Sequence, residues 1–219
     1  MNKIFSIIIP VYHEEKINET IKQISKYENC EIIVCDIEEA DTIKRIATKN
    51  VKTLTSKKGR AHQMNAGAKI AKGEVLIFLH ADTILPDDAL ESIHEVTTKA
   101  GAYDLGINNK RFIFRIIELF SSIRSRLTRI PYGDQTIFIS RKLFEEIGGY
   151  EDLEIMEDVA LMRKLKRRNE AITIINKKVL TSSRRWEKDG VIYTTLRNWV
   201  LISLYFLGVS PKKLIKYYQ

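Results

Sequence analysis

The sequence predicts an α/β fold whose open, mostly parallel, doubly wound sheet carries helices on both faces. Within residues 1–100, short apolar runs rich in isoleucine and valine alternate four times with segments of helical periodicity. Such runs are typical of strands buried on both faces of a parallel sheet, and their alternation with helices is the pattern of a doubly wound sheet. The 219 residues contain no repeat or linker, which favours a single domain.

Each half of the chain contributes a series of expected elements. In residues 1–100 the expected strands are 5–9, 31–35, 51–55 and 75–79, and the expected helices are 14–26, 41–49, 59–71 and one in which Pro86 occupies the first turn. Small side chains along 59–71 indicate a helix lying close to the sheet. In residues 101–219 the expected helices are 112–127, 141–147, one beginning at residues 157–158 and 191–207, and the expected strands are 136–139 and 171–175.

Charge is distributed unevenly. Residues 1–100 carry 14 basic and 15 acidic side chains, whereas residues 101–219 carry 22 and 13. A basic second half is compatible with phosphate-bearing substrates, an anionic membrane surface, nucleic acid or simply a solvated surface. Cys30 and Cys35 form neither a disulfide framework nor a zinc motif, and no apolar stretch is long enough to be a signal peptide or a span. We therefore expect a cytoplasmic protein, with the inner face of the membrane as a possible location.

Polar residues follow three of the expected strands: 10–14, Asp36 and Asp82. Ligands of open α/β sheets bind beyond the carboxyl ends of the strands, so these places are expected to converge on one crevice. A carboxylate there suits a hard cation that bridges two phosphates; the alternative is that Asp82 caps the next turn.

Three further clusters carry candidate chemistry. Residues 57–60 (Lys-Lys-Gly-Arg) open a helix, where backbone N–H groups and the helix dipole favour an anion. Glu157 and Asp158 start another helix and include either a general base or ordinary N-terminal acids. Residues 184–186 (Arg-Arg-Trp) suit a phosphate and a sugar face, or else a buried tryptophan beside surface arginines.

In order along the chain, these segments resemble glycosyltransferase family 2, which has the GT-A fold. The segment SIIIPVYHEE at residues 6–15 resembles the family's opening strand, and GRAHQMNAG at 59–67 resembles its third block. FLHADTILP at 78–86 is similar to the metal-binding DxD block, and MED at 156–158 resembles the motif that holds the catalytic base. Together with GDQ at 133–135 and SSRRW at 182–186, they most resemble a small bacterial glycosyltransferase-like subgroup.

The resemblance implies an inverting, metal-dependent transfer of a sugar from a nucleotide-diphosphate sugar to an acceptor hydroxyl. Residues 1–100 would bind the donor, and residues 101–219 would bind an acceptor of unknown identity. The favoured nucleotide is UDP, and the expected cofactor is Mn²⁺ or Mg²⁺. Nucleic acid is not an expected partner. The implied roles are Asp158 as base, Asp82 as metal ligand, Pro10, Tyr12, Glu14, Asp36, Lys58, Arg60 and Asp82 as nucleotide-sugar residues, and Asp134, Gln135, Glu157, Arg185 and Trp186 as acceptor or supporting residues.

The chain departs from the family pattern in several places. His80 replaces one acid of the metal motif, so metal binding depends on Asp82, and no histidine follows His94 to supply a later ligand. Residues 37–42 replace the Gly/Ser-rich turn that the family usually has beside the base of the nucleotide. Ser182 stands where polymerising relatives have glutamine, and no membrane spans follow, so we expect non-processive transfer.

Two other functions compete with this interpretation. A nucleotidyltransferase would need a glycine-rich loop after the first strand, where residues 11–14 are Val-Tyr-His-Glu. A non-catalytic binding module for nucleic acid or anionic surfaces would use the basic second half but leave Asp36, Asp82 and Asp158 without a role. The helix 191–207, followed by Lys212, Lys213 and Lys216, is expected either on a membrane surface or against the core.

Overall fold

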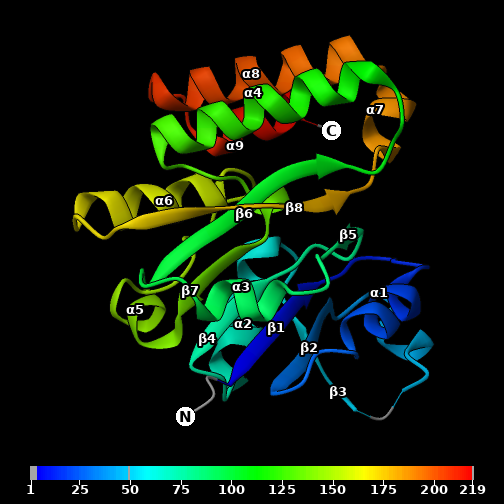
Figure 1. Ribbon diagram of the computed structural model, residues 1–219. Coiled ribbons are helices and arrows are strands. Elements are labelled where there is room, and N and C mark those ends of the chain that lie inside the picture. Colours follow the sequence, from blue (N-terminus) through cyan, green and yellow to red (C-terminus); the bar gives the residue numbers. More distant parts are fainter. Residues whose placement is uncertain (1–3, 49, 219) are drawn as a thin grey trace.

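The structure is a computed structural model that describes residues 4–48 and 50–218. In this part of the chain, strands form one curled sheet with the order β3-β2-β1-β4-β7-β6-β8-β5 (Figure 1). The strands are β1 (Phe5–Pro10), β2 (Cys30–Ile37), β3 (Val51–Ser56), β4 (Val75–Phe78), β5 (Thr83–Ile84), β6 (Ala100–Ile107), β7 (Ile137–Ser140) and β8 (Ile172–Thr181).

Helices cover both faces of this sheet, as predicted. They are α1 (Ile17–Ile24), α2 (Arg60–Ile70), α3 (Ala89–His94), α4 (Phe112–Thr128), α5 (Arg141–Glu146), α6 (Glu157–Arg167), α7 (Arg184–Asp189), α8 (Val191–Phe206) and α9 (Pro211–Leu214), with 3-10 turns η1 (Ile43–Arg45), η2 (Gly133–Gln135) and η3 (Ile215–Tyr217). None of the helices in the described residues is long and apolar enough to cross a membrane.

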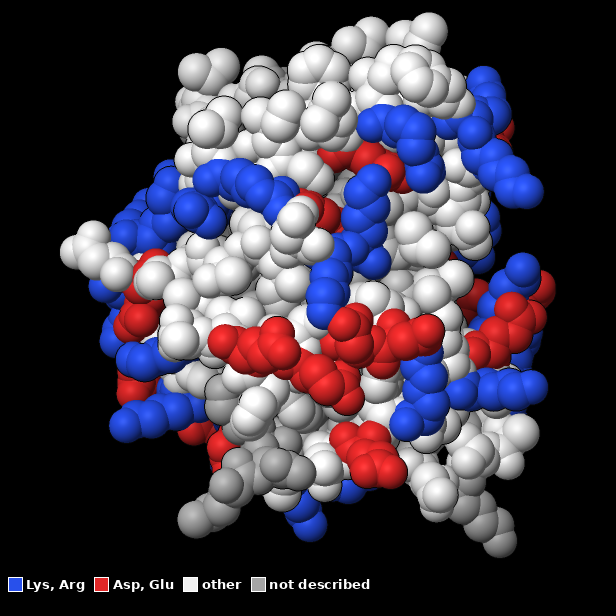
Figure 2. Space-filling view, in the orientation of Figure 1, with Lys and Arg blue, Asp and Glu red and all other residues white. Residues whose placement is uncertain are grey.

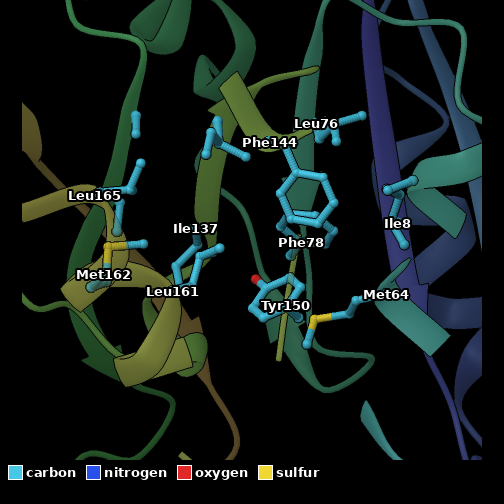
Figure 3. Packing of buried hydrophobic residues seen from close by; sticks show 14 of the residues in the cluster. Ile8, Met64, Leu76, Phe78, Ile137, Phe144, Tyr150, Leu161, Met162 and Leu165 are labelled. Carbon is cyan, nitrogen blue, oxygen red and sulfur yellow. The ribbon is translucent and has the colours of Figure 1, made fainter. Parts of the chain in front are cut away.

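The first half of the sheet is parallel, and its strands β1, β2 and β4 are mostly buried, whereas β3 at the edge is partly exposed. Strands β1 to β4 pair in parallel, and alternate side chains of β1 enter different cores: Ile7 and Ile9 pack with α1 and α3, whereas Ile8 packs with α2. Figure 3 shows the core between the sheet and α2, which includes Ile8; here Met64 of α2 lies near Phe78, Phe144 and Tyr150. The predicted strands of this half are all confirmed.

Helix α2 lies close to the sheet, as its small residues predicted. A Cβ atom at Gly67 would come within 2.6 Å of Ile8 and 2.7 Å of the Cys35 sulfur. Only glycine fits this contact without displacing the core. The close approach brings the start of α2 to the carboxyl ends of β1 and β2, where Gln63 donates to the Val11 and Cys35 carbonyl oxygens at 2.6 and 2.7 Å.

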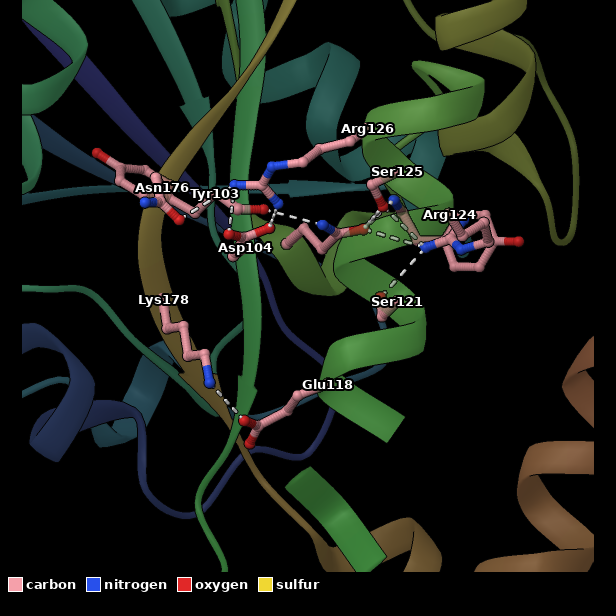
Figure 4. A network of polar contacts seen from close by, with 11 residues as sticks. Tyr103, Asp104, Glu118, Ser121, Arg124, Ser125, Arg126, Asn176 and Lys178 are labelled. Carbon is pink, nitrogen blue, oxygen red and sulfur yellow. Dashed lines mark hydrogen bonds and ion pairs between the residues drawn. The ribbon is translucent and has the colours of Figure 1, made fainter. Parts of the chain in front are cut away.

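The second half of the sheet is mixed, and β6 was not predicted. Strand β7 is antiparallel to both β4 and β6, β6 runs parallel to β8, and β5 pairs antiparallel with β8. Long polar side chains hold β6 and β8 under α4 (Figure 4): Arg126 pairs with the buried Asp104, and Glu118 pairs with Lys178 at 2.8 Å. Strand β8 is also longer than predicted, because its second half pairs with β6 beyond a register shift.

Two predicted helices differ from the observed structure. Of the helix expected at 41–49, only the turn η1 forms, because side chains take up the local backbone groups: Asp36 accepts from Ile43 N–H, and Asn18 binds both Arg45 and Ala47. Residue 49 lies outside the described residues. Pro86 precedes α3 rather than occupying its first turn, since the helix begins at Ala89 after a turn in which the Pro86 carbonyl accepts from Ala89 N–H.

Candidate functional site

A cavity of about 510 Å³ lies where the two halves of the chain meet, beyond the carboxyl end of β4. Volumes of this size suit a small-molecule ligand. The first half contributes Arg60, His80 and Asp82. The second half contributes the rest of the lining, which includes Tyr132, Gly133, Asp134, Asp158, Arg184, Arg185, Trp186, Thr194, Asn198 and Tyr218. The cavity therefore brings together charged residues that are far apart in the sequence.

Asp158 is fixed in this cavity by two backbone hydrogen bonds. Its Oδ2 accepts from Gly133 N–H at 2.6 Å and its Oδ1 from Val159 N–H at 2.7 Å. A Cβ atom at residue 133 would lie 3.0 Å from His80 Nε2 and 3.5 Å from Asp158 Oδ2, so the glycine permits the close approach of η2, His80 and α6. Met156, with φ of 67°, turns the chain into α6 and sets the direction of these acids.

Asp134 lines the same cavity in a poorly solvated position. Within the described residues its Oδ1 atom is buried and has no hydrogen-bond partner. Burial, which disfavours the charged form, raises the pKa of Asp134 to about 6. A carboxylate with this pKa is able to exchange a proton near neutral pH, so Asp134 is a candidate proton acceptor in this cavity alongside Asp158.

The raised pKa of Asp134 predicts how the stability of the fold depends on pH. The folded state favours protonated Asp134, so its stability falls as pH rises from about 3.8, the pKa of an ordinary aspartate, to about 6, and the penalty then stays constant. Asp134→Asn removes this charge. We expect it to raise the free energy of unfolding by about 1–3 kcal/mol near pH 8, and by much less near pH 4. Urea unfolding in chelator measures both values; an equal gain at the two pH values would contradict the assignment.

Arg60 and Glu157 form an ion pair at the edge of the cavity. Arg60 Nε lies 2.7 Å from Glu157 Oε1, and the Glu157 side chain is only 3% exposed. Burial raises the pKa of Glu157 to about 7, although Arg60 opposes this shift. Glu157 thus orients Arg60, whose guanidinium lines the cavity, while Glu157 itself lies behind it.

Asp82 lies at a junction between two cavities. It lines the first cavity and also a second one of about 310 Å³ that includes Glu14, Lys16 and Asn108. Between them, Arg184 Nη2 lies 3.1 Å from Asp82 Oδ2 and 3.4 Å from Glu14 Oε2. The guanidinium therefore neutralises the carboxylates in the position where a cation would be favoured, and a divalent ion that binds Asp82 must compete with Arg184.

A metal ion fits this site only with help from a ligand. Among residues 4–48 and 50–218, no group of three or more His, Cys, Asp or Glu side chains is arranged to hold a metal. Mg²⁺ and Mn²⁺ that bridge phosphates need only one or two protein carboxylates, and the partly exposed Asp82 meets this requirement. His80 is half-buried, and its poorly solvated position together with nearby Arg60 lowers the pKa of its imidazole, so it contributes no positive charge near neutral pH.

The predicted nucleotide residues are only partly brought together. Arg60 and Asp82 line the larger cavity, and Glu14 and Asp82 line the smaller one. The others, Pro10, Tyr12, Asp36 and Lys58, lie outside both cavities. Lys58 Nζ lies 5.1 Å from the centre of the Tyr12 ring, so the segments that follow β1 and precede α2 do meet. Asp36, in contrast, is fully buried, and its carboxylate accepts hydrogen bonds from the backbone N–H groups of Ile37 and Ile43.

The predicted acceptor residues also separate into two groups. Asp134, Arg185 and Trp186 line the larger cavity. Gln135, in contrast, is fully buried: its Oε1 accepts from Ser125 Oγ at 2.8 Å, and its Nε2 donates to the Tyr103 carbonyl oxygen at 2.9 Å. Gln135 therefore holds η2 against β6 and α4 and positions its neighbours in the cavity.

Sequence reasoning missed several cavity residues. Arg184 was singled out only as part of a motif, although it is the side chain that contacts Asp82. Thr194 and Asn198 lie in the helix predicted from its apolar residues, yet both line the cavity. Their spacing of four residues on one face of a helix is the signal that identifies them. Tyr132, whose ring stacks with the Arg124 guanidinium at 3.4 Å, gave no recognisable signal.

Residues 6–148 match the family described as glycosyl transferase family 2. The chain therefore belongs to glycosyl transferase family 2. A curated relative, glycosyltransferase GlyG of Streptococcus pneumoniae serotype 4, is 28% identical over 120 residues, which are 50% of this chain and 40% of that protein. The match thus spans about two fifths of the relative's length.

Two solved structures share the fold. The mannosyltransferase PcManGT of Pyrobaculum calidifontis, in complex with GDP-Man and Mn²⁺, superposes with a TM-score of 0.66 at 18% identity, over 97% of this chain and 67% of the other. Residues 1–349 of S. aureus TarS superpose with a TM-score of 0.60 at 17% identity, over 98% and 69% of the two chains. Both confirm the predicted GT-A fold.

Proposed function

We propose that the protein is a non-processive, inverting glycosyltransferase that moves a sugar from a nucleotide-diphosphate sugar to an acceptor hydroxyl. The observation that carries this proposal is one cavity that is lined both by Asp82 and Arg60 of the first half and by Asp158 and Asp134 of the second. Such a cavity offers cationic and metal-binding groups for a diphosphate together with carboxylates for an attacking hydroxyl.

The proposed donor site comprises the junction at Asp82 and the start of α2. Mn²⁺ or Mg²⁺ bound at Asp82 would neutralise the diphosphate as it leaves, and Arg60 and Lys58 add positive charge near it. UDP is the proposed nucleotide, with GDP as the alternative because the structural neighbour PcManGT binds GDP-Man. Pro10, Tyr12 and Asp36 remain the proposed contacts for the nucleoside.

The proposed chemistry on the acceptor side is proton transfer to Asp158. Two backbone N–H groups hold this carboxylate in place, and each of its oxygens retains a lone pair for a substrate hydroxyl. A hydroxyl that loses its proton to Asp158 as it attacks the anomeric carbon displaces the diphosphate in one step with inversion. Arg185, Trp186 and Asp134 are the proposed contacts of the acceptor.

A screen of donor hydrolysis tests the proposed function. The full chain is incubated with a panel of UDP-, GDP- and dTDP-sugars, with and without Mn²⁺, and release of the nucleoside diphosphate is measured. We expect at least one donor to be hydrolysed only when Mn²⁺ is present. Hydrolysis of none, with no nucleotide binding by calorimetry, would exclude the proposed activity.

We further propose that α8 attaches the protein to the inner face of the cytoplasmic membrane. Its outward face exposes Ile192, Tyr193, Leu196, Trp199 and Val200, and Trp199 meets the exposed Phe120 of α4 with ring centres 6.3 Å apart. The end of the molecule formed by α4 and α8 is mostly uncharged in Figure 2, with Lys and Arg side chains below it. An apolar face with basic neighbours suits an anionic lipid surface.

Vesicle flotation tests this membrane contact. We expect the protein to float with vesicles of phosphatidylcholine and phosphatidylglycerol, and Trp199→Glu, which places a charge in the apolar face, to leave most of it unbound. Ile70→Glu is the matched control, because Ile70 is an exposed apolar side chain on α2, outside this face. Wild-type protein that stays in the soluble fraction with and without anionic lipid would contradict the proposal.

A further inference from the structure

Helix α8 has a second face, which is turned toward the active-site cavity. Thr194, Asn198, Leu201 and Ile202 of this helix line the cavity that also contains Asp158. Their spacing of four and then three or four residues places them in one row along the helix. One face of α8 is therefore apolar and exposed, and the other face supplies one wall of the cavity.

Helix α8 and the neighbouring α7 bring to this cavity polar atoms that have no hydrogen-bond partner among the described residues. They are Thr194 Oγ1, Asn198 Oδ1 and Trp186 Nε1, all buried. The whole Thr194 side chain is inaccessible to solvent. A buried polar group left unpaired costs about 1–3 kcal/mol, so three of them beside one cavity indicate that another molecule satisfies them.

We propose that Trp186, Thr194 and Asn198 form an acceptor subsite that binds the hydroxyl groups of a neutral saccharide. This inference rests on the proposed glycosyltransferase function and names its acceptor class. The three free atoms are an N–H donor, a hydroxyl that both donates and accepts, and an amide oxygen that accepts. Sugar hydroxyls match such a mixed set, and the indole ring offers an apolar surface for the C–H face of the sugar.

The side chains that would bind a neutral acceptor differ from those that would bind a charged one. Trp186, Thr194 and Asn198 are uncharged, whereas a phosphate-bearing acceptor requires cations such as Arg185 and Lys188, which also line the cavity. The two classes of acceptor thus depend on different side chains, and substitutions distinguish them.

The test uses Thr194→Val, which keeps the shape of the side chain and removes its hydroxyl. Binding of a panel of neutral mono- and disaccharides to the full chain, in UDP and Mn²⁺, is measured by saturation-transfer NMR. We expect at least one saccharide to bind wild-type protein, and Thr194→Val and Asn198→Leu each to weaken its affinity about tenfold, the effect of one hydrogen bond of about 1.4 kcal/mol.

Thr195→Val is the matched control. The Thr195 hydroxyl donates to the Val191 carbonyl oxygen at 2.8 Å within the same helix, and Thr195 lies outside the cavity lining. This variant should bind the saccharide as wild type does, and thermal unfolding shows whether each variant is folded.

Three results would overturn the subsite. They are the absence of binding by any neutral saccharide, equal binding by the Thr194→Val and Thr195→Val variants, or binding of phosphorylated sugars alone that is lost in Lys188→Gln. Donor hydrolysis by wild-type protein is measured in parallel. If hydrolysis occurs and the subsite test fails, only this inference is wrong; if hydrolysis also fails, the proposed function is wrong as well.

Discussion

Asp158→Asn is expected to lower the rate of sugar transfer by about 10²–10⁴, the usual effect of removing a general base. The amide cannot take a proton from the acceptor hydroxyl. Donor and metal binding should persist, because these depend on Asp82 and the start of α2. Single-turnover transfer, together with calorimetric binding of the nucleotide and Mn²⁺, measures the two effects separately.

Two neighbouring carboxylates provide the controls for this experiment. Asp134 has a raised pKa and an unpaired buried oxygen, and Glu157 is paired with Arg60. Glu157→Gln should affect transfer less than Asp158→Asn, because it leaves the carboxylate of Asp158 in place. If Asp158→Asn keeps near-normal turnover and Asp134→Asn or Glu157→Gln does not, the base has been assigned to the wrong carboxylate.

The substitution also has a structural effect that must be separated from the chemical one. Both Asp158 oxygens accept backbone N–H groups, so an asparagine amide must face one of them, Gly133 N–H or Val159 N–H, without a hydrogen bond. Thermal unfolding and intact donor binding show whether the cavity survives. A product that retains the anomeric configuration of the donor would exclude single displacement altogether.

Asp82→Ala is expected to abolish the metal-dependent part of nucleotide binding. Since no cluster of three metal-ligating side chains occurs in the described residues, the loss of this carboxylate leaves the ion with little besides the phosphates and water. Calorimetric titration with UDP, with and without Mn²⁺, measures the difference. Unchanged affinity in the presence of Mn²⁺ would show that Asp82 is not the ligand.

Asp87→Ala is the matched control for this substitution. Asp87 is an acid of the same loop region, its side chain is 98% exposed, and its partner is Lys26 rather than Arg184. It should leave binding unchanged. Asp82→Ala also frees Arg184 from one of its two carboxylates, so any remaining metal-independent binding of nucleotide reports on the attraction of that guanidinium for phosphate.

The first half of the fold and the order of the motifs were predictable because the signal is local. A strand buried on both faces must be apolar at nearly every position, so residues 5–9 and 75–79 are recognisable without knowledge of their partners. The carboxylates at strand ends follow from the same logic. Asp82 was thus identified from its place after a strand, and Asp158 from its place at a helix start and from the resemblance of residues 156–158 to a family motif, although their roles remain proposals.

The second half was decided by contacts between distant residues. Strand β6 contains two glycines and an aspartate, which disfavour a strand locally. Gly101 is required because a Cβ atom there would lie 2.3 Å from the Thr173 carbonyl oxygen, and Asp104 is tolerated because Arg126 of α4 neutralises it. Neither partner is adjacent in sequence, so local propensity gave no indication of this strand.

The sequence by itself determined which residue types this protein has available for binding phosphate, metal and an acceptor hydroxyl, because motif and strand-end patterns are local. Only the tertiary structure decided where those side chains are directed. Gln135 and Asp36 are turned toward backbone groups, Arg184 is placed against Asp82, and α8 presents Thr194 to the cavity. Side-chain direction depends on which buried polar groups find partners across the fold, and this is fixed only when the elements pack together.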